Sequence, residues 1–301
     1  MQKLTVTPKD DSKRIDLFLK EKLAISRKQA KSLLDAGRVF LKKKKILMAG
    51  WQVQTDNVFE IFAPNETIEK KSPSRKRFLK IYYEDADLLV VEKPAGVACE
   101  RTAQTTSSTL VDDINDYLKR QSGSPHNYLG LMHRLDKGTS GLMVYTKSKR
   151  ANALSQQFKN HSIERQYLAL VHGRMGKAEG RIQVPILKDP TNPRRQITAS
   201  KNQPGLPSAI TDYQVVERYP NATLIEATLQ TGRTHQVRVH LASLGHPIIG
   251  DRVYGQDDGL NRHALHANFL AFHHPVSKKP MKFNSPLPPD LKALIDQLRS
   301  Y

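Results

Sequence analysis

Segment 133–141, with the sequence HRLDKGTSG, sets charged side chains beside glycine and hydroxyl residues between two apolar stretches. Its carboxylate, Asp136, stands in a loop that leads into a strand predicted over 142–145. A loop held by core strands can present a carboxylate rigidly, as a nucleophile or a general base requires. The same residues could instead form a turn in which Asp136 and Ser140 cap backbone amides. Composition alone leaves both interpretations open.

A second polar segment, 230–241 (QTGRTHQVRVHL), combines two arginines with two histidines. Its apolar spacing favours a helix with Thr234 as the N-cap, so that Arg233 lies just ahead of the helix. His235 and His240 are five residues apart and share a face in neither a helix nor a strand. The spacing therefore argues against a metal site.

Two further side chains are candidates for chemistry. Tyr167 lies in a predicted strand over 167–171, where it either packs in the core or offers a platform for a base. Cys99 is the only cysteine, which excludes an internal disulfide and any multi-cysteine metal site. We expect its thiol to be buried and inert.

These residues must be positioned by a mixed α/β domain of about 220 residues, because strand and helix patterns alternate from residue 79 onward. Strands are predicted over 88–91 and 223–229, and residues 188–210 form a basic loop. Helices are predicted over 108–118, 149–161 and 291–298. The sequence thus predicts a domain over 79–301.

The first 62 residues form a separate predicted module of two short helices and short strands, with Ser26 as N-cap of the second helix. Residues 63–78 are polar and charged without an apolar period, which is typical of a linker. The first 80 residues hold 20 Lys and Arg against 9 Asp and Glu, a net +11 of the total +19.

A surplus of this size favours a polyanionic partner, and nucleic acid is preferred to a membrane surface. The chain has no apolar run long enough to cross a bilayer, and its start lacks the apolar stretch of a signal peptide, so a cytoplasmic location is expected. We expect Arg27, Lys28 and Lys31 in the N-terminal module to contact RNA phosphates.

Taken together, residues 79–295 resemble the RluA-type family of RNA pseudouridine synthases. The resemblance rests on the turn 93–97 (KPAGV), segment 133–141, the strand 167–173 (YLALVHG), the stretch 231–251 and residues 265–267 (LHA). The N-terminal module is similar, more loosely, to the RNA-binding domain of ribosomal protein S-four. A run of four lysines at 42–45 replaces the short turn usual in that domain.

The resemblance implies an α+β fold with a mixed, largely antiparallel sheet, preceded by a small α/β RNA-binding domain. It implies isomerisation of uridine to pseudouridine without cofactor or metal. Separately, we expect the protein to be a monomer. The implied site comprises Asp136 as the essential carboxylate, Arg233 as its ion-pair partner and Tyr167 as the stacking platform and candidate proton acceptor. Arg134 would fill the gap left by the flipped nucleotide, and Leu265 would line the base pocket.

The expected substrate is structured RNA, most readily large-subunit ribosomal RNA, and a transfer RNA is the alternative. A noncatalytic RNA-binding protein of ribosome assembly is less favoured, because the three site residues that its catalytic relatives need are present. A base-excising glycosidase is disfavoured as well, since such enzymes generally use two carboxylates and the motif offers one.

Overall fold

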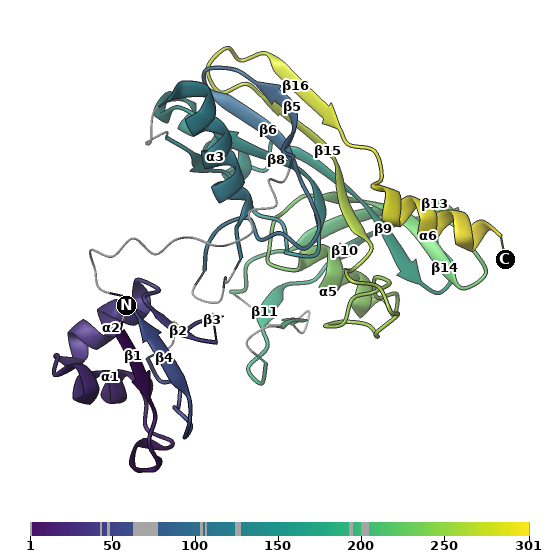
Figure 1. Cartoon of the computed structure of the whole chain (residues 1–301). Coiled ribbons are helices and arrows are strands. Elements are labelled where there is room, and N and C mark those ends of the chain that lie inside the picture. Colours follow the sequence, from purple (N-terminus) through teal and green to yellow (C-terminus); the bar gives the residue numbers. More distant parts are fainter. Residues whose placement is uncertain are drawn as a thin grey trace. The chain divides into compact units, whose positions relative to one another are not determined.

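The computed structural model describes residues 2–42, 44–46, 49–62, 78–102, 105, 107–123, 128–192, 195–199 and 205–300. The chain divides into two compact units (Figure 1). One comprises Met1–Arg77 with Glu100–Ser108, and the other Phe78–Cys99 with Thr109–Tyr301. The linker predicted over 63–78 lies outside the described residues except for Phe78.

The N-terminal unit has its own core of apolar side chains, which includes Ile15, Phe18, Leu34 and Phe59. Ser26 caps its second helix as predicted, in a reciprocal capping box with Gln29. The four strands form an antiparallel sheet in the order β1-β4-β2-β3. The elements are β1 (Gln2–Thr5), η1 (Pro8–Asp10), α1 (Ile15–Leu23), α2 (Arg27–Asp35), β2 (Val39–Leu41), β3 (Lys44–Lys45) and β4 (Val58–Ile61).

The larger unit is built on one extended sheet, ordered β10-β13-β14-β9-β15-β8-β6-β5, with β16 beside β15 and β7 beside β8. Among the described strands of this sheet, β8 and β15 form the only parallel pair, so the predicted mixed, largely antiparallel sheet is confirmed. Its strands are β5 (Lys80–Glu84), β6 (Leu88–Lys93), β7 (Gly130–Leu131), β8 (Ser140–Thr146), β9 (Glu164–His172), β10 (Glu179–Gln183), β13 (Ile210–Arg218), β14 (Ala222–Leu229), β15 (Leu265–His273) and β16 (Pro280–Asn284).

Helices cover the faces of this sheet, as Figure 1 shows for α3 beside β6 and β8 and for α6 across β9, β13 and β14. Leu291 and Ile295 of α6 pack on Leu168, Leu170 and Leu224. In the part of the chain that the structure describes, no helix has the length and apolar character needed to cross a membrane. The helices are α3 (Leu110–Ser122), η2 (Lys149–Ala153), α4 (Leu154–Lys159), α5 (Gln236–Ser243) and α6 (Pro289–Arg299).

Two predicted elements differ from the structure. The helix predicted over 149–161 is a 3-10 turn, η2, followed by the short α4. The predicted basic loop 188–210 contains the strand β12 (Gln196–Thr198), which pairs with β11 (Ile186–Lys188) in a separate two-stranded sheet. Neither a short turn of this kind nor a two-stranded pairing leaves a strong apolar period in the sequence.

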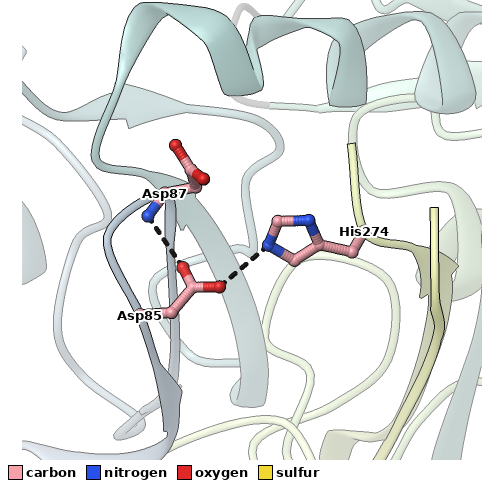
Figure 2. Close-up of side chains that lie close together, drawn as sticks. All are labelled: Asp85, Asp87 and His274. Carbon is pink, nitrogen blue, oxygen red and sulfur yellow. Dashed lines mark hydrogen bonds and ion pairs between the residues drawn. The ribbon is translucent and has the colours of Figure 1, made fainter. Parts of the chain in front are cut away.

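A network of polar side chains joins the β5–β6 turn to the β15–β16 turn. Figure 2 shows the Asp85 carboxylate between the backbone nitrogen of Asp87 and the ring of His274, whose Nε2 lies 2.9 Å away. The Arg150 guanidinium binds Asp87 through two hydrogen bonds and lowers its pKa. Because these carboxylates already have protein partners, we interpret the Asp85–Asp87–His274 group as structural rather than as a metal site.

Candidate active site

Asp136 lies on the loop between β7 and β8, and its neighbours in sequence are fixed on both sides. The Leu135 amide donates to Cys99 Sγ at 3.3 Å, and the Cys99 thiol donates back to the Leu135 carbonyl at 3.1 Å. On the other side, the ammonium of Lys93 donates to the Lys137 carbonyl at 3.2 Å. The loop therefore presents the carboxylate from a fixed backbone, and Cys99 is buried as expected.

Lys93, at the end of β6, is fully buried. Its Nζ also donates to the carbonyls of Pro94, at 3.0 Å, and Val97, at 2.8 Å. The Gly96 amide donates to the same Lys137 carbonyl at 2.7 Å. The turn 94–97 is thereby joined to the loop that carries Asp136, which gives the lysine a positioning role.

The titration of Lys93 can be tested through stability. Burial lowers the pKa of Lys93 from 10.5 to about 8, so its charge opposes folding below that pH. Between about pH 8 and 10.5 the folded chain loses the proton before the unfolded chain does, so stability rises with pH. We expect the free energy of unfolding of the wild type to gain up to about 3 kcal/mol relative to Lys93→Met across this interval. Urea unfolding of both proteins checks this, and a pH-independent difference would contradict it.

The charged partner of Asp136 is Arg238, on α5. Its Nη1 donates to Asp136 Oδ2 at 2.8 Å, while Nε and Nη2 donate to the two oxygens of Asp251 at 2.7 and 2.8 Å. The guanidinium also lies over the Tyr254 ring, 5.1 Å from its centroid. Burial opposes the charge of Arg238, but the two carboxylates outweigh burial and raise its pKa. A single buried guanidinium therefore orients two carboxylates.

The predicted pairing of Asp136 with Arg233 is wrong in this structure. Arg233 is exposed, and its Nε donates to the Ser208 carbonyl at 3.3 Å. The predicted cap is also wrong, because the residue before α5 is His235, in the left-handed conformation with φ 58°, and no side chain caps the helix there. Arg233 precedes this bend, whereas Arg238 lies within a helical stretch buried on all sides.

The sequence signal for Arg238 is indirect, because it requires the burial of the helix to be known. An arginine in a fully buried helix requires an acidic partner. Asp251 follows the apolar run 247–250 and supplies that partner.

Tyr167 and Leu265 are brought together near Asp136. Tyr167 is 7% exposed on β9, on the same face as Ala169, and Ala169 pairs with Leu265 of β15. Tyr167, Leu265 and Leu135 belong to one apolar cluster. Burial raises the pKa of the Tyr167 phenol and outweighs the opposing charge of Arg165, while the charge of Asp136 adds to the rise. The hydroxyl is therefore protonated at neutral pH.

The remaining predicted residues are exposed. Arg134, next to Leu135 in the loop, is exposed on the larger unit. Lys28 and Lys31 are exposed on α2 of the N-terminal unit. Arg27 is exposed as well, although its Nε donates to Asp16 at 2.8 Å.

His235 is a neighbour of Asp136 whose position the sequence did not predict. Its Nδ1 lies 2.8 Å from the Tyr254 hydroxyl, and its Nε2 lies 3.8 Å from Asp136 Oδ2. The Gln196 amide donates to the same hydroxyl at 2.8 Å, which favours donation of the hydroxyl proton to Nδ1. The proton of the neutral ring is then on Nε2, on the side of Asp136.

Comparison with known proteins identifies the family of this chain. Residues 87–243 match the family described as RNA pseudouridylate synthase. A Bacillus subtilis protein named uncharacterized RNA pseudouridine synthase YlyB is 34% identical over 302 residues, which cover 98% of this chain and 97% of that protein. The ribosomal large subunit pseudouridine synthase D of Zymomonas mobilis is 33% identical, over 99% of this chain and 97% of that protein.

The fold is shared with a solved structure, human RNA pseudouridylate synthase domain containing 4, at a TM-score of 0.61. That match is 24% identical and covers 73% of this chain and 93% of the human chain. The chain belongs to the RNA pseudouridylate synthase family, in its RluA-type branch. It is an RNA pseudouridine synthase, an isomerase that converts uridine in RNA to pseudouridine.

Proposed function

We propose that this enzyme modifies specific uridines of large-subunit ribosomal RNA in the cytoplasm, with Asp136 as the essential carboxylate acting on a flipped nucleotide. The observation that supports the site assignment is the 2.8 Å ion pair between Arg238 and Asp136. The loop that carries Asp136 is held in place by Lys93 and Cys99. The names of the Zymomonas mobilis relative and of a Vibrio vulnificus relative, ribosomal large subunit pseudouridine synthase C, support the proposed RNA.

The isomerisation conserves every atom of the substrate. The bond between C1′ of the ribose and N1 of the uracil breaks, the base turns, and a bond forms between C1′ and C5. C5 then loses a proton and N1 gains one. Asp136 serves either as the nucleophile on the substrate or as the base that starts bond cleavage, and Arg238 and Asp251 hold it in place.

In this proposal the target base stacks on Tyr167, Leu265 lines its pocket, and Arg134 fills the space that the base leaves. Extrusion of a nucleotide costs a few kcal/mol. Stacking on an aromatic ring recovers about 1–3 kcal/mol of that cost. The remainder comes from phosphate contacts, to which the formal charge of +19 contributes.

The Tyr167 hydroxyl is tested by Tyr167→Phe, which keeps the ring and removes the proton-bearing oxygen. We expect RNA affinity to persist and single-turnover conversion to fall by about 10²-fold or more, the usual contribution of a positioned acid or base. Tyr219→Phe, at another buried tyrosine, is the matched control and should convert at the wild-type rate. Conversion by Tyr167→Phe at the wild-type rate would contradict a role of the hydroxyl in proton transfer and would leave Tyr167 with the stacking role alone.

The N-terminal unit is proposed to bind RNA through α2. Lys28 and Lys31 are three residues apart and neighbours on the exposed part of α2, whereas Ala30 and Leu34 are buried. We expect the double variant Lys28→Ala, Lys31→Ala to reduce the slope of log affinity against log salt by roughly 0.7–0.9 for each phosphate that these lysines neutralise in the wild type. The rate at saturating RNA should be unchanged. An unchanged slope, matching the control Lys9→Ala, would count against this surface.

The target RNA is tested by mapping pseudouridines in total RNA of the source organism with and without the gene. Loss of pseudouridine at positions of the large-subunit RNA supports the proposal. Loss confined to transfer RNA would replace the proposed target with the alternative. Conversion of no RNA by the purified protein would favour the noncatalytic assembly role, and free uracil in the product would favour a glycosidase.

A further inference from the structure

Arg165 is a buried cation to which the site described above gives no role. It lies on β9, only 9% of its surface is exposed, and its Nε has no hydrogen-bond partner. Its guanidinium lies over the Phe158 ring, 5.7 Å from the centroid. Within the described ranges no carboxylate forms an ion pair with it, whereas the buried Arg238 and Arg262 both bind acids.

A buried guanidinium without an acidic partner is costly to the folded protein, because the loss of hydration is offset only in part by the Phe158 ring. The charge of Arg165 acts on the His133 ring and on the Tyr167 phenol, and both of these groups are neutral, so neither is a counter-ion. Burial, aided by the positive charge of Arg165, lowers the pKa of His133 to about 3, so its ring is neutral. A charge retained at this cost without a partner indicates a ligand that supplies the negative charge.

Arg165 is placed beside the platform for the base. Residues two apart on a strand share a face and lie about 7 Å apart, so Arg165 neighbours Tyr167 on the face that meets the Asp136 loop. The Nη1 atom of Arg165 lies against Gly232, since a Cβ added to this glycine would approach Nη1 to 2.8 Å. Gly232 is exposed, so this end of the guanidinium is close to the surface ahead of α5.

We propose that Arg165 binds the phosphodiester adjoining the uridine whose base stacks on Tyr167. This inference rests on the proposed function. One ribose separates a base from its phosphate, which fits a contact on the neighbouring side chain of the same strand face. Guanidinium binds phosphate through paired hydrogen bonds, and the contact with Phe158 involves one face of the group and not its nitrogen atoms.

The test combines a protein variant with a neutralised phosphate. The RNA is a hairpin containing the mapped uridine, either unmodified or with a methylphosphonate at the phosphodiester on its 5′ or 3′ side. Single-turnover conversion against enzyme concentration gives the half-saturating concentration for the wild type, Arg165→Met and Arg165→Lys. Arg299→Met is the control for the loss of one positive charge, because α6 lies beside Leu168 and Leu170, which alternate along β9 with Arg165 and Tyr167.

For the wild type we expect one of the two methylphosphonates to raise the half-saturating concentration about tenfold or more. Arg165→Met should show the same rise with unmodified RNA and no further rise with that methylphosphonate. The half-saturating concentration of Arg165→Lys should lie between those of the wild type and Arg165→Met, because an ammonium keeps the charge but lacks the paired donors of the guanidinium. The thermal stability of Arg165→Met should equal or exceed that of the wild type, since an uncompensated buried charge has been removed.

Independent, multiplying effects of the variant and the methylphosphonate would overturn the inference, because Arg165 would then contact another group, such as a uracil carbonyl. Lowered stability of Arg165→Met with unchanged RNA binding would also overturn it in favour of a structural role. Absence of conversion by the wild type on any RNA would instead refute the proposed function. The two failures are therefore distinguishable in one set of assays.

Discussion

Asp136→Asn is expected to reduce conversion of uridine to the level without enzyme while leaving RNA affinity unchanged. The amide keeps the shape of the side chain, and its oxygen still accepts the hydrogen bond from Arg238 Nη1, so the loop keeps its position. It carries no charge and can act neither as a nucleophile nor as a base. The measurement is single-turnover conversion at saturating RNA, together with binding and thermal unfolding of the purified variant.

The matched control for this variant is Asp212→Asn, which removes the charge of a half-buried carboxylate on β13 that is paired with the exposed Arg181 on β10. It should convert RNA at the wild-type rate, because exposed ion pairs contribute about 1 kcal/mol or less to stability. Conversion by Asp136→Asn above the no-enzyme background would remove Asp136 from the proposed chemistry. A loss of RNA binding equal to the loss of conversion would make Asp136 a binding residue.

Much of the positioning of Asp136 could be predicted from the sequence, because it depends on local patterns. The apolar strand that follows the loop and the turn after β6 both leave compact signals near the residues concerned. The contacts that hold the loop in place left no such signal in the sequence. The contacts of Leu135 with Cys99 and of Lys137 with Lys93 join residues 36 and 44 positions apart, and no spacing rule relates such pairs.

The prediction of Arg233, rather than Arg238, as the partner of Asp136 failed for a specific reason. A cap at Thr234 is chemically reasonable, but the chain bends at His235 instead, in a left-handed conformation that a non-glycine residue adopts at some cost. Arg233, ahead of the bend, is exposed to solvent, whereas Arg238, after it, reaches Asp136. Burial around the whole of α5 is a tertiary property, because the helix lacks the polar face of a surface helix.

Arg238→Met is therefore expected to reduce both stability and activity strongly. It leaves Asp251, which is nearly inaccessible, and Asp136 without their shared cation. Removal of one partner from a buried ion pair costs about 3–5 kcal/mol. Conversion should fall to near background because Asp136 loses its orientation. Arg238→Lys should be impaired almost as strongly, since one ammonium cannot donate to both carboxylates in the geometry of the fork.

The pH dependence of stability separates loss of charge compensation from loss of packing. In the wild type Arg238 outweighs burial and holds the pKa of Asp251 below its ordinary value. Without Arg238, burial is the largest influence on Asp251 and outweighs the hydrogen bond from the Val253 amide, so we expect its pKa to rise above that of the unfolded chain. The variant's deficit is then complete at neutral pH and shrinks as the pH falls through that raised pKa, because the folded chain takes up the proton.

Urea unfolding of the wild type and Arg238→Met between about pH 7 and pH 4 measures this change. A deficit that stays constant across the interval would show that packing alone is lost. Arg233→Gln is the matched control, since Arg233 lies five residues away and is exposed. Its stability should stay within about 0.5 kcal/mol of the wild type, and its rate at saturating RNA should be retained. Loss of conversion in Arg233→Gln with full activity in Arg238→Met would reverse the assignment, because the guanidinium at Asp136 in the working enzyme would then be that of Arg233.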